Sequence, residues 1–186
     1  MFQNLIGNEK VKDILEKTIN DKSVLHSYLF IGIEGIGKSL FAKEFASCVL
    51  GINCDLENNP DFMIVNPDGN SIKIEQIRLL IQKIYEKPVS SDRKVYIIND
   101  AEKMTTEAQN SLLKTLEEPP LYATLILTTS NESKLLSTII SRCTKIYFLP
   151  IEEKEILKYV NDNNLKDVNN SIISACQGSI RKTNGI

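Results

Sequence analysis

The chain has 186 residues, of which 42% are hydrophobic and 25% charged, and its formal net charge is −2. These values fit a globular protein with one domain, or one domain and a small appendage, and exclude a strongly basic surface. Any contact with nucleic acid must then be local or made through a larger assembly. No run approaches the roughly 18 apolar residues of a membrane span, and residues 1–10 lack a signal-peptide pattern, so we expect a cytoplasmic protein without membrane contact.

The first predicted elements are a helix and a buried strand. Asn8 is a candidate N-cap for the helix, in which four apolar residues share one face: Val11, Ile14, Leu15 and Ile19. The apolar run 28–31 predicts the strand. His26 stands just before this run, and we interpret it as a structural residue rather than a ligand or a base.

A Gly-rich motif follows the strand and opens a second helix. It matches the pattern G-x-x-x-x-G-K-S, and six residues form the predicted phosphate site: Gly32, Gly35, Ile36, Gly37, Lys38 and Ser39. The glycines let backbone N–H groups face a phosphate, Lys38 would reach the β- and γ-phosphates, and the Ser39 hydroxyl would hold Mg²⁺. The helix N-terminus adds to the anion site. The alternative, a Gly-rich turn between two core elements, gives no reason for Lys38 and Ser39.

Short apolar runs then alternate with amphipathic helices. Strands are predicted at 62–65, 95–98, 124–128 and 145–148, and a turn at 67–70. Apolar residues from Ile74 to Ile84 mark one helix, which we expect to end near Pro88. Thr106 and Gln109 resemble a capping box for the next helix, which Pro119 stops.

This alternation implies parallel strands joined by crossovers, which is a doubly wound α/β sheet. Ligands of such sheets bind beyond the carboxyl ends of the strands. The Gly-rich loop, the pair 99–100 and the pair 128–129 all follow predicted strands, so we expect them to form one site. Only helical patterns follow Pro150. We therefore expect a nucleotide-binding core at 1–150 and an incomplete helical lid domain at 151–186.

Four stretches resemble the clamp-loader branch of the AAA+ ATPases: residues 26–30, 110–120, 128–131 and 141–143. The triplet Ser141-Arg142-Cys143 is the most specific of them, and residues 178–181 extend the likeness into the lid. Within this family the chain is most similar to the delta-prime type of bacterial DNA polymerase III subunit. The resemblance implies a hetero-pentameric ring with gamma/tau and delta type subunits, which opens a sliding clamp and places it on primed DNA. It also implies ATP or ADP with Mg²⁺ as ligands.

The resemblance also implies roles for residues at the ends of the predicted strands 95–98 and 124–128. In active relatives the former ends in Asp-Glu, where Asp orders the Mg²⁺ shell and Glu polarises water. Here Asn99 and the shorter Asp100 take these places, so we expect nucleotide binding with little hydrolysis. Alternatives are a shifted register, with Asp100 as the metal partner, and a plain strand end. Thr128 or Thr129 would sense the γ-phosphate, unless it is a strand-end threonine satisfied locally.

Two arginines complete the implied site. Arg142 follows a predicted helix that leaves the core, and it would act as an arginine finger on a neighbouring subunit. Its plain alternative is a solvated arginine at a helix C-terminus. Arg181 resembles a lid arginine that folds over the nucleotide.

Cysteine spacing argues against the four-cysteine zinc module that many relatives carry. The chain has Cys48, Cys54, Cys143 and Cys176, without C-x-x-C spacing. We expect no zinc site and reduced, mostly buried thiols.

Three functions remain open at this point. The first is a clamp-loader subunit with weak or absent ATPase activity, enzymatic only as part of the polymerase holoenzyme. The second is a gamma/tau-type motor subunit with its own ATPase cycle. The third is a P-loop metabolite kinase, which would need an acceptor pocket rich in Arg and Asp that the sequence does not indicate.

Overall fold

The computed structural model describes residues 1–2, 5–52, 56–152 and 154–156. Its centre is a five-stranded sheet with the strand order β2-β3-β4-β1-β5, in which every pair of neighbours is parallel. The strands are β1 (Ser27–Ile31), β2 (Phe62–Val65), β3 (Lys94–Ile98), β4 (Ala123–Thr129) and β5 (Thr144–Tyr147). Each lies within a residue or so of a predicted run, so the predicted parallel α/β sheet is confirmed.

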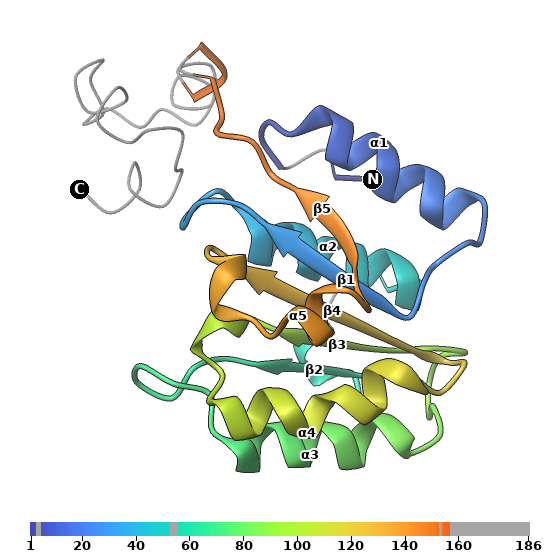
Figure 1. The fold of residues 1–186 in the computed structure, drawn as a ribbon. Helices are drawn as coiled ribbons and strands as arrows, with labels where there is room; N and C mark the ends of the chain where they lie inside the picture. Colours follow the sequence, from blue (N-terminus) through green and yellow to red (C-terminus); the bar gives the residue numbers. More distant parts are fainter. Residues whose placement is uncertain (3–4, 53–55, 153, 157–186) are drawn as a thin grey trace.

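Helices cover both faces of this sheet (Figure 1). They are α1 (Glu9–Asn20), α2 (Lys38–Leu50), α3 (Ile74–Tyr85), α4 (Thr106–Glu117) and the one-turn α5 (Ser137–Ile140). Three 3₁₀ turns lie between them: η1 (Leu56–Asn58), η2 (Ala101–Lys103) and η3 (Glu132–Lys134). The helix predicted before Arg142 is the one-turn α5, which the 3₁₀ turn η3 precedes.

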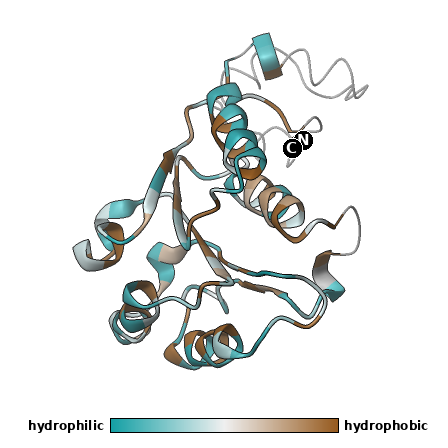
Figure 2. Ribbon diagram, turned by 90° about the vertical axis from the view of Figure 1, so that its right-hand side faces the viewer, coloured by the Kyte–Doolittle hydropathy of each residue, from teal (hydrophilic) through white to brown (hydrophobic). Residues whose placement is uncertain are grey.

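The hydrophobic core has two halves because successive strand residues point to opposite faces of the sheet. Phe30 and Ile97 face α1 and α2, whereas Leu29 and Ile98 face α3, α4 and α5. Figure 2 shows the helices on either side of the sheet with both teal and brown residues, as expected for amphipathic helices. The predicted apolar face of α1 is wrong at Ile14, because half of its surface is exposed and it does not share the buried face of Val11 and Leu15.

The predicted capping of α1 and α4 was wrong in detail. Asn8 precedes α1 with a φ of 54° and makes no side-chain cap; its amide instead exchanges two hydrogen bonds with the backbone of Leu149. The cap of α4 is Thr105, whose hydroxyl accepts a bond from the Ala108 N–H, one residue before the predicted cap. The Thr105 bond is an ordinary local N-cap, whereas Asn8 has a partner 141 positions away that no local pattern specifies.

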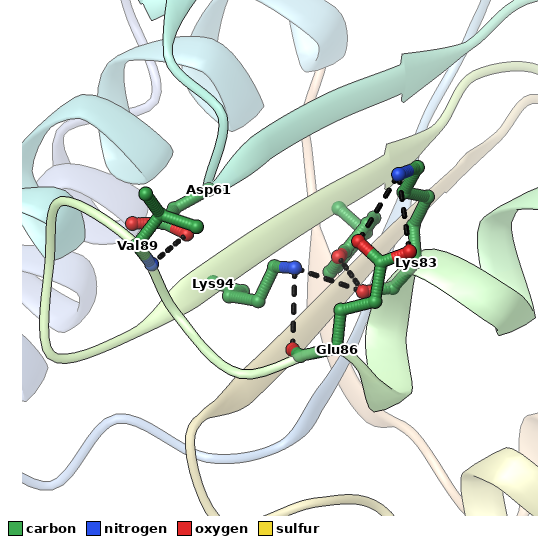
Figure 3. A network of polar contacts seen from close by, with 6 residues as sticks. Asp61, Lys83, Glu86, Val89 and Lys94 are labelled. Carbon is green, nitrogen blue, oxygen red and sulfur yellow. Dashed lines mark hydrogen bonds and ion pairs between the residues drawn. The ribbon is translucent and has the colours of Figure 1, made fainter.

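Two buried charges organise the amino ends of β2 and β3, the edge opposite the Gly-rich loop (Figure 3). Asp61 accepts bonds from the N–H groups of Val89, Ser90 and Ser91, all at 2.7–2.8 Å. The Lys94 ammonium donates to the carbonyl oxygens of Lys83 and Glu86 at the end of α3. Lys94 therefore satisfies carbonyls that a helix terminus leaves without intrahelical partners.

Candidate functional site

The Gly-rich loop joins β1 to α2 and depends on three glycines. Gly35 and Gly37 have φ values of 78° and 98°, in the region that L side chains rarely adopt. Gly32 is needed for space, because a Cβ there would lie 2.8 Å from the Phe148 Cβ. The loop thus passes close to the segment after β5 and turns tightly into the N-terminus of α2.

Lys38 is the first residue of α2, and its side chain folds back into the loop. Its ammonium donates to the carbonyl oxygens of Gly32 at 2.7 Å and Ile33 at 2.8 Å. Only 6% of the residue is exposed, and this burial lowers the pKa of Lys38, although the carboxylates of Glu102, Asp100 and Glu34 oppose the shift. The ammonium is therefore held over the loop, where it can exchange its carbonyl partners for phosphate oxygens.

The ends of β3 and β4 meet beside this loop, joined by the Thr128 hydroxyl. This group donates to the Asn99 side-chain oxygen at 3.3 Å and accepts from the Asp100 N–H at 3.2 Å. Thr128 is buried, and both hydrogen-bond partners of its hydroxyl lie directly after β3. In addition, the Gly32 N–H donates to the Thr129 carbonyl oxygen, which ties the loop to β4.

Neither residue that follows β3 directs an unpaired carboxylate at the loop. Asn99 is neutral, and its amide nitrogen donates to Asn66 at 2.9 Å. Asp100 has a φ of 48°, and its carboxylate forms an ion pair with Lys103 at 3.0 Å. Of these two residues, only Asp100 brings a negative charge to this strand end.

Glu102 is a residue of this edge that the sequence reasoning missed. It accepts hydrogen bonds from the N–H group of Ser130, at 3.0 Å, and from the Ser130 hydroxyl. Burial would raise the pKa of Glu102, but these bonds outweigh it and hold the pKa below its ordinary value. Its charge also acts on Lys38. The signal in the sequence was an acidic residue four positions beyond a buried strand, opposite a polar strand end.

Arg142 lies two residues after α5 and contacts the last residue of α4. It is not part of the group of residues at the carboxyl ends of the strands. Its guanidinium donates to the Thr138 carbonyl at 2.8 Å and forms an ion pair with Glu117 at 2.6 Å. The flanking residues anchor the turn: the Ser141 hydroxyl bonds Thr138, and Cys143 is buried in the core. Burial raises the pKa of the Cys143 thiol to about 12, so this cysteine is a packing residue.

The structure therefore brings the Gly-rich loop, Asn99, Asp100 and Thr128 to one edge. Arg181, Cys54 and Cys176 lie outside the described residues, as does most of the predicted lid. Within the described ranges, Cys48 and Cys143 are free thiols, and no group of three or more His, Cys, Asp or Glu residues could hold a metal ion. In the same part of the chain, no helix has the length and apolar character needed to cross a membrane.

A family model described as "DNA polymerase III, delta subunit" matches residues 7–152. The chain belongs to this family of clamp-loader proteins. The Bacillus subtilis DNA polymerase III subunit delta' is 39% identical over 79% of the chain and 49% of its own length. The Mycoplasma genitalium subunit gamma/tau is 34% identical over 97% of the chain and 34% of its own length. The chain thus spans at most about half of these relatives.

Solved structures agree on the fold of this clamp-loader family member. A DNA polymerase III gamma subunit-related protein from Thermotoga maritima has a TM-score of 0.72 and 24% identity, over 90% of this chain and 55% of that one. The RuvB Holliday junction branch migration motor of the same organism has a TM-score of 0.66 and 21% identity, over 96% and 59%. At such identities the likeness concerns the P-loop α/β fold alone.

Proposed function

We propose that this chain is the delta-prime type of clamp-loader subunit, a cytoplasmic protein that binds nucleotide with little or no hydrolysis. It works in a hetero-pentameric ring with gamma/tau and delta type subunits, which places a sliding clamp on primed DNA. In that ring it donates Arg142 to the ATPase site of a neighbouring subunit. The observation that carries the proposal is the neutral Asn99 at the end of β3, beside an Asp100 already paired with Lys103.

The Gly-rich loop fits a nucleotide phosphate. Gly35 and Gly37 give it a tight backbone turn, of the kind whose N–H groups can face a phosphate, and the Lys38 ammonium bonds two carbonyl oxygens of the loop. The N-terminus of α2 adds its dipole. When bound, the nucleotide would place its phosphates on this loop, and the Ser39 hydroxyl would be the side-chain ligand for Mg²⁺. Because Asn99 contributes no charge, the metal would add little to the affinity.

A gamma/tau-type motor subunit is the second candidate, and one observation favours it. Relatives with that name match 97% of the chain, whereas the delta' relative matches 79%. The two candidates differ in turnover, because a motor subunit needs a carboxylate pair at the end of β3 to order the metal and the attacking water. Here that position holds Asn99.

The nucleotide site is tested by titrating the protein with ADP and ATP, with and without Mg²⁺. Lys38→Ala should lower the affinity at least about tenfold, because a charge-assisted bond to phosphate is lost. Lys10→Ala, an exposed lysine on α1, is the matched control and should bind like wild type. Circular dichroism should show that both variants fold. Equal affinities for wild type and Lys38→Ala would remove the loop as the site.

A further inference from the structure

The motif at 110–120 includes a glutamate that the proposed function does not use. Glu117 is the last residue of α4, and its carboxylate pairs with Arg142, which lies 25 positions further along the chain. Exposed ion pairs of this kind contribute little to stability. Its partner is the arginine that we assign to the neighbouring subunit.

The two ends of α4 fix α5 and Arg142 to the same helix. Near its start, the Gln109 side-chain oxygen accepts a bond from the Leu136 N–H at 2.8 Å, and its amide donates to the Lys134 carbonyl. Eight residues later, which is about 12 Å along a helix, Glu117 contacts Arg142. Ile139 of α5 is fully buried in the core half that also contains Leu116. The segment that leads to Arg142 is thus held against the start of α4, and the guanidinium at the tip of the side chain contacts its end.

The contacts of the Arg142 guanidinium occupy only some of its N–H donors. Nη1 donates to Thr138 and Nη2 to Glu117. A guanidinium carries five N–H donors, so Nε and the second hydrogen of each terminal nitrogen can still bond a phosphate oxygen. With 32% of its side chain exposed, Arg142 can be reached from outside. The two contacts therefore orient the guanidinium and leave part of it free to bind a further group.

We propose that Glu117 is a positioning residue: it holds the guanidinium of Arg142 in the orientation in which a neighbouring subunit's nucleotide meets it. This inference rests on the proposed arginine donation. A flexible arginine must lose rotamer freedom when it binds the transition state, and Glu117 imposes much of that loss beforehand. Its contribution therefore belongs to the hydrolytic step and not to the binding of ATP.

The experiment measures ATP hydrolysis by the complete clamp loader, assembled from the full-length protein and its partner subunits. Glu117→Ala should lower kcat about tenfold, or to the level of Arg142→Ala if that is reached first, with KM unchanged; misplacing such a group by 1 Å can cost about 10²-fold. Glu117→Gln keeps an acceptor at the same place and should retain most of the rate. Glu118→Ala, the exposed neighbour, is the matched control and should match wild type.

The double variant separates positioning from a general structural role. If Glu117 acts only through Arg142, then Glu117→Ala combined with Arg142→Ala is no slower than Arg142→Ala alone. Assembly and melting temperature are measured for every variant. A wild-type or higher rate for Glu117→Ala, a changed KM, or additive losses would overturn the positioning role. An unchanged rate for Arg142→Ala would instead refute the arginine donation itself.

Discussion

Asp61 and Lys94 are charged residues that the fold buries against main-chain groups rather than against each other. Burial alone would raise the pKa of Asp61, but the N–H groups of Val89, Ser90 and Ser91 outweigh it and lower the pKa. The carboxylate is thus the anchor of the loop before β3. These hydrogen bonds offset the free-energy cost of burying the Asp61 carboxylate.

Asp61→Asn should destabilise the protein by about 2 kcal/mol at pH 7, since the charged acceptor of several N–H groups is lost. The lowered pKa gives the sign of the pH dependence. The stability from ionised Asp61 is fully present above the ordinary aspartate pKa of about 3.9 and is lost as pH falls through the lower folded-state value. Urea unfolding should therefore show the gap between wild type and variant closing below about pH 4. The exposed Asp92→Asn should show no such gap; a constant gap down to pH 2 would contradict this account.

At the scale of the element, α4 organises the part of the molecule that carries Arg142. It begins at the Thr105 cap, contacts the segment before α5 through Gln109 and ends at Glu117. Its apolar residues Leu112 and Leu116 lie in the same core half as Ile139 of α5. A change that frays α4 should therefore disturb Arg142 as well.

Thr105→Ala should cost about 1 kcal/mol, because the Ala108 N–H loses its cap. Thr106→Ala should be neutral or slightly stabilising, because exposed Thr106 is already helical and alanine is the better helix former. Chemical denaturation of the two variants measures this difference. If Thr106→Ala proves the more damaging, the cap lies where the sequence first suggested.

At the scale of the whole molecule, the Gly-rich loop and Arg142 lie on different elements. The Gly-rich loop is the candidate phosphate site at the carboxyl ends of the strands, and the residue directly after β3 is the neutral Asn99. Arg142 lies on a different element, at the end of α4. Under the proposed function, the subunit would bind nucleotide in its own site, and its Arg142 would act on the nucleotide of a neighbouring subunit.

The isolated protein should release phosphate from ATP at or near the background rate, because Asn99 cannot neutralise the metal. Asn99→Asp combined with Asp100→Glu should raise turnover only when a neighbouring subunit supplies an arginine. A phosphate-release assay on the isolated and the assembled protein tests both statements. Brisk hydrolysis by isolated wild type would favour the motor-subunit function instead.

The sequence by itself determined the strands, the order of the helices and the Gly-rich loop, because these depend on local periodicity and on backbone freedom at a few glycines. It also placed Asn99 at the end of β3, since a fully apolar strand ends where its polar residues begin. The family resemblance predicted the role of Arg142 as an arginine finger.

Only the tertiary structure decided the partners of the polar side chains. Asn8 bonds Leu149, 141 positions away, and Glu102 bonds Ser130, 28 positions away. Glu117 likewise meets Arg142 only because α5 folds back onto α4. Such partners are set by which elements lie side by side in the folded chain, and no local pattern carries that information. A polar group without a local partner takes whichever donor or acceptor the packing brings to it.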